Sequence, residues 1–255
     1  MTRVIKVGGR PQSDPALVSA LASAQHRTPG SLVVVHGGGD EVSTLQRLNG
    51  VVSEFKGGRR VTSLLDLEII RMALSGSANK RLVSALVAAG APALGLSGED
   101  AGLLLAAPLD TAQFGYVGVP VSVNTTLLRH LLDGGYLPVL SPVSRCTSAA
   151  DGLTLNVNGD DAAAAIAVAL EAEELLLVSD VPGVLRDGVP MASLSSDDAH
   201  RLIDDGTASG GMAAKLQAAL AALEGGVERV RISDIAAIGD RERGTELTRV
   251  GSVCT

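Results

Sequence analysis

Two lysines and one aspartate occupy positions where the side chains could act together on an anion. Lys6 lies near the end of an apolar run and is followed by Gly8 and Gly9, while Lys215 lies in the first turns of an expected helix. A lysine in a buried strand is costly unless its ammonium is paired or reaches the carboxyl end of the sheet, where ligands bind. A lysine near a helix N-terminus opposes the helix dipole, so a bound anion would compensate it. Asp160, at the start of another expected helix, supplies a carboxylate that could hold both ammonium groups.

A run of three glycines follows a second apolar segment, in the sequence His36-Gly37-Gly38-Gly39-Asp40. Each glycine costs roughly 0.5–1 kcal/mol relative to alanine, and one is normally enough for a tight turn. Three glycines before a helix therefore predict a cradle of backbone amides for a phosphoryl group or a carboxylate. His36 has no evident nucleophile or metal partner, so we expect it to form structural hydrogen bonds.

Two further polar segments could bind the rest of a substrate. Asn156-Val157-Asn158-Gly159-Asp160 joins an extended segment to a helix start, where side-chain oxygens and free amides can meet a charged ligand, although Asn and Asp are also ordinary helix caps. Arg59-Arg60 offers a guanidinium fork for a carboxylate, although paired arginines often form a solvated face.

Taken together, these sites predict phosphoryl transfer. Two lysines, two sets of glycine amides, an acid that holds the lysines and an arginine for the acceptor supply the positioning and charge neutralisation that this chemistry needs. The chain has neither the G-x-x-x-x-G-K-[ST] pattern nor G-x-G-x-x-G after a strand, so other glycine turns must bind any phosphate.

Composition limits the class of protein. The 255 residues are 46% hydrophobic but only 2% aromatic, so the core must consist of Ala, Val, Leu and Ile, as in parallel sheets covered by helices. A net charge of −7 argues against non-specific nucleic-acid binding, which needs a basic field. No apolar run is long enough to span a membrane. We therefore expect a soluble cytoplasmic protein with small-molecule partners, no nucleic acid and no membrane association.

Strand and helix signals alternate along the whole chain. Strands are predicted at 3–7, 31–35, 92–96, 137–140, 174–179 and 229–232, and helices at 14–25, 40–49, 64–74, 79–89, 125–133, 160–170, 195–203 and 212–223. Residues 103–123 differ, because short alternating segments broken by Pro and Gly predict an antiparallel flap or hairpin.

This alternation predicts an α/β fold: a three-layer αβα sandwich with a mainly parallel central sheet and a small β-hairpin flap. We expect an N-terminal lobe (1–150) and a C-terminal lobe (151–255) on one continuous sheet.

The order of the motifs resembles that of the amino-acid kinase family. Between Val4 and Ile232 the chain carries Lys6-x-Gly8-Gly9, His36-Gly37-Gly38-Gly39, Gly58-x-Arg60-Val61-Thr62, Gly95-Leu96-Ser97-Gly98-x-Asp100, Asn156-x-Asn158-x-Asp160, Ser179-Asp180-Val181-x-Gly183-Val184 and Gly211-Met212-x-x-Lys215. Within the family the chain is most similar to the branch that uses ATP to phosphorylate the side-chain carboxylate of N-acetyl-L-glutamate in arginine biosynthesis.

The resemblance implies a role for each lobe and for each matching position. The N-terminal lobe (1–150) would serve acyl-substrate binding and dimerisation, and the C-terminal lobe (151–255) would bind ATP. Lys6 and Lys215 would stabilise the transferring phosphoryl group, and Asp160 would orient both ammonium groups. The backbone amides of Gly8 and Gly9 would bind phosphate, and those of Gly38 and Gly39 would bind the acceptor. The side chains of Arg60 and Asn156 would also bind the acceptor. The adenine nucleotide would contact Asp180, Val181, Gly183, Leu185, Gly210, Gly211 and Met212. The resemblance also implies Mg²⁺ carried mainly by ATP oxygens, with no protein metal ligand expected from the sequence.

The acceptor remains open at this stage. Gly159 stands where the acetylglutamate branch usually has Ala, and the residues around Lys6 and His36 are also similar to kinases acting on carrier-bound aminoadipate (or glutamate) in lysine or arginine synthesis. A non-catalytic amino-acid- or nucleotide-binding regulator of the same fold is a further alternative, although it would not need both lysines. In the family that the chain resembles, arginine-inhibited members carry an extra N-terminal helix that links dimers into hexamers. This chain begins almost at its first strand, so the resemblance implies a homodimer insensitive to arginine.

Overall fold

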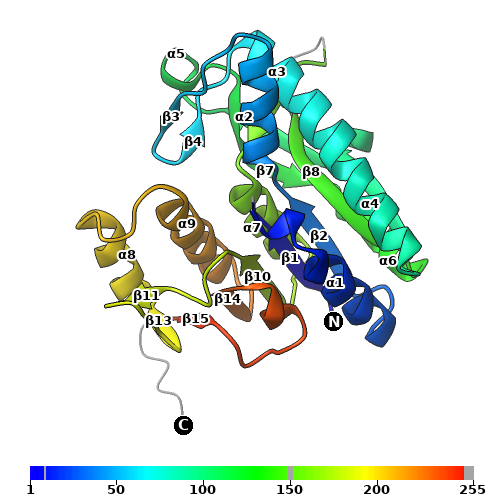
Figure 1. The fold of residues 1–255 in the computed structure, drawn as a ribbon, viewed down its shortest axis with the longest axis vertical. Helices are drawn as coiled ribbons and strands as arrows, with labels where there is room; N and C mark the ends of the chain where they lie inside the picture. Colours follow the sequence, from blue (N-terminus) through cyan, green and yellow to red (C-terminus); the bar gives the residue numbers. More distant parts are fainter. Residues whose placement is uncertain (9, 149–151, 250–255) are drawn as a thin grey trace.

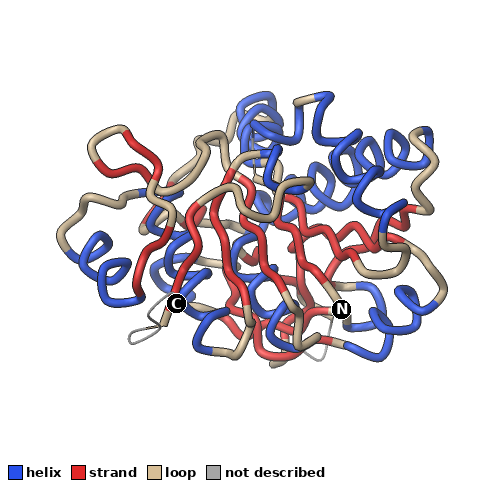
Figure 2. Tube along the Cα trace, turned by 90° about the horizontal axis from the view of Figure 1, so that it is seen from below, coloured by secondary structure: helices blue, strands red, loops and turns tan. Residues whose placement is uncertain are grey.

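A sheet of mainly parallel strands crosses the molecule, with helices on both of its faces (Figures 1 and 2). The computed structural model of the chain describes residues 1–8, 10–148 and 152–249. Within them, an 11-stranded sheet has the order β13-β15-β14-β10-β1-β2-β8-β6-β7-β9, and β5 also pairs with β8. Its strands are β1 (Arg3–Val7), β2 (Leu32–His36), β5 (Ala93–Gly98), β6 (Leu104–Pro108), β7 (Val117–Val123), β8 (Leu137–Cys146), β9 (Thr154–Val157), β10 (Glu174–Val178), β13 (Ser193–Ser195), β14 (Arg229–Ser233) and β15 (Thr245–Thr248).

Helices connect most of these strands, and two small hairpins stand apart from the sheet. The helices are α1 (Pro15–Arg27), α2 (Gly39–Leu48), α3 (Leu64–Arg71), α4 (Asn79–Ala88), α5 (Thr111–Phe114), α6 (Thr125–Asp133), α7 (Gly159–Ala169), α8 (Ser196–Asp204) and α9 (Gly210–Glu224). Short 3-10 segments are η1 (Arg10–Ser13), η3 (Asp100–Gly102) and η4 (Ile235–Ile238), and η2 (Met72–Ala78) is a π-helix. The hairpins are β3 (Phe55–Lys56) with β4 (Arg59–Arg60), and β11 (Leu185–Arg186) with β12 (Val189–Pro190).

Alternate side chains of the central strands enter two separate hydrophobic clusters. In β1, Ile5 and Val7 pack with α1 and α4 on one face, whereas Val4 packs with α6, α7 and α9 on the other. Because neighbouring side chains of a strand point to opposite faces, Lys6 shares the face of Val4 and points toward α7 and α9. The three-layer αβα fold expected from the sequence is confirmed.

The strand order reverses at β1, which lies between β10 and β2. This strand is parallel to both of its neighbours, and Val7 is in register with His36 of β2 and Val178 of β10. The chain moves to one side of β1 to form β2 and returns on the other side as β10. Such a reversal of strand order leaves a crevice at the carboxyl ends of the strands, which is where open α/β sheets bind ligands.

The helices predicted at 64–74 and 79–89 form one continuous helical rod. The sequence predicted two separate helices, but η2 joins α3 to α4 as a π-helix. Tertiary contacts hold this segment: the Ser75 hydroxyl lies 2.7 Å from that of Ser141, and Asn79 donates to the Val139 carbonyl at 2.9 Å. A π-segment within a helix often marks a functional site.

The antiparallel pairing expected within residues 103–123 is confirmed, but the pair is not a free flap. β6 and β7 pair with each other and also extend the central sheet, because β6 pairs with β8 and β7 with β9. The short helix α5 in their connection was not predicted. At the expected lobe boundary, residues 149–151 lie outside the described part of the chain, and β9 beyond them pairs with β7 and β8.

Candidate active site

A buried cluster of two lysines and one aspartate lies at the carboxyl edge of β1. The Lys6 ammonium is 2.8 Å from Asp160 Oδ1, and Lys215 Nζ is 3.4 Å from Oδ1 and 3.3 Å from Oδ2 of the same carboxylate. All three residues are at most 9% exposed. Asp160 is held in the first turn of α7, where its backbone N–H donates to the Asn158 side chain at 2.8 Å. The sequence therefore placed these three residues together correctly.

The cluster carries an excess of positive charge. Burial alone would raise the pKa of Asp160, but the ammonium groups of Lys6 and Lys215 outweigh burial and hold this pKa below its ordinary value. Burial, with Lys6 as the second cause, lowers the pKa of Lys215 to about 8. Two ammonium groups against one carboxylate leave one uncompensated positive charge in a poorly solvated place, which favours binding of an anion.

Gly8 brings the backbone between the two ammonium groups. A Cβ built on this glycine would lie 3.2 Å from Lys6 Nζ and 3.7 Å from Lys215 Nζ. A larger residue would therefore reach into the space that both ammonium groups face, and the glycine leaves that space open. Gly9, which was predicted to bind phosphate, lies outside the described residues.

Arg60, in strand β4 of the small hairpin, is 8% exposed. Its Nη1 donates to the Gln46 side chain and to Ser53 Oγ, and its Nη2 donates to the Gly39 carbonyl at 3.1 Å and to Ser43 Oγ at 3.0 Å. Burial lowers the pKa of this guanidinium, but the group remains charged. The ring of Phe55 covers it at 4.5 Å.

His36 and the π-segment fix the glycine run. His36 is fully buried, with Nδ1 at 2.8 Å from the Gly37 carbonyl and Nε2 at 3.0 Å from the Asn79 amide. A neutral ring that donates from Nδ1 and accepts at Nε2 satisfies both contacts. Gly38 has φ of 150°, and a Cβ there would lie 2.7 Å from the Leu74 side chain. The structural role expected for His36 is confirmed by this geometry.

One cavity of about 200 Å³ collects residues from both halves of the chain. Asn156 borders it with its side-chain amide 3.0 Å from the Thr62 hydroxyl, to which it donates. Of the site residues predicted from the sequence, those lining the cavity are Lys6, Gly38, Gly39, Arg60, Asn156, Asp160 and Gly211. The cavity is thus continuous from the charged cluster to the arginine.

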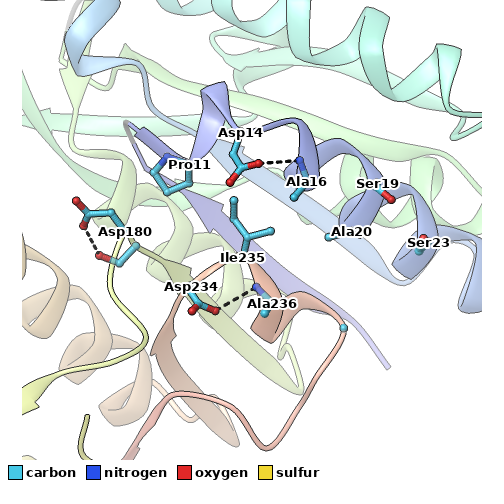
Figure 3. A pocket seen from close by; sticks show the side chains of 12 residues that line it. Pro11, Asp14, Ala16, Ser19, Ala20, Ser23, Asp180, Asp234, Ile235 and Ala236 are labelled. Atoms are coloured by element: carbon cyan, nitrogen blue, oxygen red, sulfur yellow. Dashed lines mark hydrogen bonds between the residues drawn. The ribbon is translucent and has the colours of Figure 1, made fainter. Parts of the chain in front are cut away.

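Of the positions expected to bind a nucleotide, Gly211 lines that cavity and the others do not. Asp180, just after β10, lines a separate hollow of about 700 Å³ between α1 and η4, together with Asp14 and Asp234 (Figure 3). Leu185 is in the β11–β12 hairpin and is 41% exposed, and Gly183 packs against Thr245.

Gly210 and Gly211 start α9, and Met212 packs against the main hydrophobic cluster. Val181 lies in the turn between Asp180 and Gly183. Their role in nucleotide binding stays a prediction.

Several residues that shape the site were not singled out from the sequence. Gln46, Ser43 and Ser53 hold Arg60, and Asn79 holds His36. None of them carries a local signal, because a polar side chain on a helix face is usually solvated. The capping residue Ser63 in front of α3 was recognisable, because Asp66 follows three residues later and forms a capping box with it.

No helix in the described part of the chain is long and apolar enough to cross a membrane. Among the same residues, no group of three or more His, Cys, Asp or Glu side chains could hold a metal ion.

The buried histidine predicts a pH dependence of stability. Burial lowers the pKa of His36 from 6.5 to about 4. Between these two pH values the imidazole is protonated in the unfolded chain but stays neutral in the folded one. The folded state should therefore keep this contribution above pH 6.5 and lose about 3 kcal/mol of unfolding free energy as the pH falls to 4.

Urea unfolding at pH 7.5, 6 and 5 measures this loss, and His36→Gln should flatten the slope in this range. The exposed His200 provides a matched control, because His200→Gln should leave the slope unchanged. Identical slopes for wild type and His36→Gln would contradict the assignment.

The chain resembles known proteins over nearly its whole length. The family model described as the amino acid kinase family matches residues 1–234. Acetylglutamate kinase from Chloroflexus aurantiacus is 44% identical over 247 residues, which cover 96% of each protein. Acetylglutamate kinase from Geobacillus stearothermophilus is 43% identical over 233 residues, covering 91% of this chain and 89% of the relative.

Structural similarity extends over nearly the whole chain as well. The crystal structure of smu.665 from Streptococcus mutans UA159 has a TM-score of 0.87 and 31% sequence identity, and the match covers 97% of this chain and 98% of that one. The family match, the two relatives and this structure agree with the motif order read from the sequence, and this chain belongs to the amino acid kinase family.

Proposed function

We propose that this chain transfers the γ-phosphoryl group of ATP to the side-chain carboxylate of N-acetyl-L-glutamate, as its relatives named acetylglutamate kinase do. The observation that carries the proposal is the pair of buried ammonium groups that share Asp160 and face Gly8. In the transfer, an acceptor carboxylate oxygen forms a bond to the γ-phosphorus while the bond to the β-bridging oxygen breaks, giving an acyl phosphate and ADP. This reaction belongs to arginine biosynthesis in the relatives' branch.

Each residue of the cluster has a distinct part in this step. Lys6 and Lys215 stabilise the charge that develops on the phosphoryl oxygens, and Asp160 keeps both ammonium groups charged and aligned. No protein group needs to form a covalent intermediate. Mg²⁺ bound to the phosphates of ATP would neutralise further charge, and the residues described here provide no separate cage for it.

The cavity next to the cluster suits a small acceptor. Arg60 would bind its α-carboxylate, which requires that carboxylate to replace one of the oxygens now held by Nη2, while Asn156 would bind the acetamido end. Gly159 does not exclude this acceptor: a Cβ at this position would lie 3.3 Å from Lys6 Cε, a contact that a small shift relieves. We further propose a cytoplasmic homodimer, which sedimentation velocity would detect as a species of twice the 25.8 kDa chain mass.

The choice of acceptor is tested directly by ADP release. N-acetyl-L-glutamate, free glutamate and carrier-linked aminoadipate are compared side by side with ATP and Mg²⁺. Acetylglutamate should give the highest kcat/KM, because the cavity of about 200 Å³ fits a small amino-acid derivative. A higher kcat/KM with the carrier-linked substrate would assign the chain to the other branch, and no ADP release with any acceptor would favour a binding protein.

Loss of either ammonium group should remove most of the activity. Lys6→Ala and Lys215→Ala are each expected to lower kcat by roughly 100- to 1,000-fold, the range seen when one preorganised electrostatic donor is deleted. Steady-state kinetics at saturating ATP and acceptor measure the loss. Near-full turnover in either variant would refute the roles assigned here.

The lowered pKa of Lys215 predicts the alkaline limb of the pH profile. With a pKa of about 8 in the free enzyme, Lys215 is charged below pH 8 and neutral above it. Because the charged form stabilises the phosphoryl group, kcat/KM should fall tenfold per pH unit above about 8. A profile that stays flat from pH 7 to 9.5 would show that Lys215 does not need its proton.

Arg60→Ala should raise the acceptor KM by roughly 10- to 100-fold, which corresponds to one or two lost hydrogen bonds to a charged group. The KM for ATP should stay unchanged, because Arg60 lies on the acceptor side of the cavity. Thermal unfolding of the variant is measured in parallel, since Arg60 also holds Gln46 and Ser53. A folded variant with an unchanged acceptor KM would remove Arg60 from the site.

A further inference from the structure

A second ion pair lies beside the catalytic cluster and joins the two sides of the cavity. Arg59 Nη2 is 2.7 Å from Asp161 Oδ2, and the side chains are only 22% and 14% exposed. Arg59 belongs to the β3–β4 hairpin and Asp161 to the first turn of α7. The two residues are 102 positions apart in the chain.

Each partner is the direct neighbour of a residue in the proposed site. Arg59 and Arg60 both border the cavity but have different partners: Arg60 donates to the Gly39 carbonyl, whereas Arg59 pairs with Asp161. Successive residues of a helix are rotated by about 100°, so Asp160 reaches the lysines while Asp161 reaches the hairpin. The ion pair therefore connects the arginine of the acceptor region to the catalytic carboxylate through one peptide unit on each side.

The hairpin also contacts α9, the helix that carries Lys215. Its turn consists of Gly57 and Gly58, both with positive φ (54° and 76°), as a two-residue hairpin turn of type I′ requires. A Cβ on Gly58 would lie 3.0 Å from the Gly210 carbonyl and 3.4 Å from Ala214 Cβ. The hairpin thus lies directly on the N-terminus of α9, the helix that carries Lys215.

Charge balance gives the pair a second effect. Burial raises the pKa of Asp161, and the Arg59 guanidinium opposes this rise. Without Arg59, an unpaired carboxylate would stand next to Asp160, in a region where the γ-phosphate and the acceptor both bring negative charge. Removal of one partner of a poorly solvated pair is costly because the remaining charge is left uncompensated.

We propose that Arg59 and Asp161 are positioning residues that hold the β3–β4 hairpin against α7 and so align the acceptor arginine with the catalytic lysines. This inference rests on the proposed kinase function for its kinetic consequence, but the contact that it describes can be measured without activity.

Kinetics test the alignment with Arg59→Leu, Asp161→Asn and the double variant. Each single variant should lower kcat/KM for the acceptor by about 10- to 100-fold, the loss expected from a displacement near 1 Å, with the KM for ATP within twofold of wild type. The double variant should be no worse than the poorer single one, because both changes break the same contact. The proposal would be overturned if the losses of the two single variants multiplied in the double variant, or if both single variants had unchanged kinetics.

Hydrogen exchange of the free protein tests the contact independently. Peptides that cover residues 55–60 should exchange faster in Arg59→Leu and Asp161→Asn than in wild type, and wild-type exchange in both would overturn the proposal. The matched control is Arg201→Leu, which removes an exposed ion pair with Asp198 in α8 and should change neither readout. If wild type releases no ADP with acetylglutamate, the proposed function fails, while the exchange measurement still decides whether the pair holds the hairpin.

Discussion

The buried carboxylate of Asp160, shared by the ammonium groups of Lys6 and Lys215, is the interaction on which the rest of the site depends. Two ammonium groups can be buried together only if an anion lies between them, because an unpaired buried charge costs several kcal/mol. Asp160 meets that need at the N-terminus of α7, where the helix dipole also favours a negative charge. The remaining positive charge is compensated only when a further anion binds. A phosphoryl group or a similar anion would supply that charge, so the stability of the cluster and its proposed function share one physical origin.

The three residues of this cluster belong to elements that are far apart in the sequence. β1 ends between β2 and β10, and α7 and α9 cover the same face of the sheet. Parallel strands and packed helices are rigid, so the nitrogen and oxygen atoms of the cluster keep their separations without a metal ion or a disulfide. The acceptor side depends instead on a small hairpin, β3–β4, which has few backbone hydrogen bonds of its own and gains its position from side-chain contacts. We therefore expect ion pairs to the hairpin, such as Arg59–Asp161, to contribute more than those elsewhere on the surface.

A buried hydrogen-bond network holds the backbone of the glycine run in place. His36 of β2, Asn79 at the start of α4 and the Val139 carbonyl of β8 are linked by hydrogen bonds. Each group in such a network must be satisfied, because an unpaired polar group in a poorly solvated place is expensive. The network therefore locks the backbone of Gly37 and Gly38 beside the cavity. It also explains why the helical rod continues through a Ser-Gly-Ser segment that would be a poor helix in isolation.

The sequence alone determined the layers of the fold, the order of the motifs and the membership of Lys6, Asp160 and Lys215 in one site, because strand and helix periodicity and the cost of buried charge are local properties. It also indicated Arg60 and the glycine run, since unusual glycine content and paired arginines are visible without a structure. Only the tertiary structure decided that residues 103–123 join the central sheet, that 72–78 is a π-helix, and that Arg59 meets Asp161. Those features depend on contacts between segments as much as 102 residues apart, and no local preference records which surfaces will meet once the chain is folded.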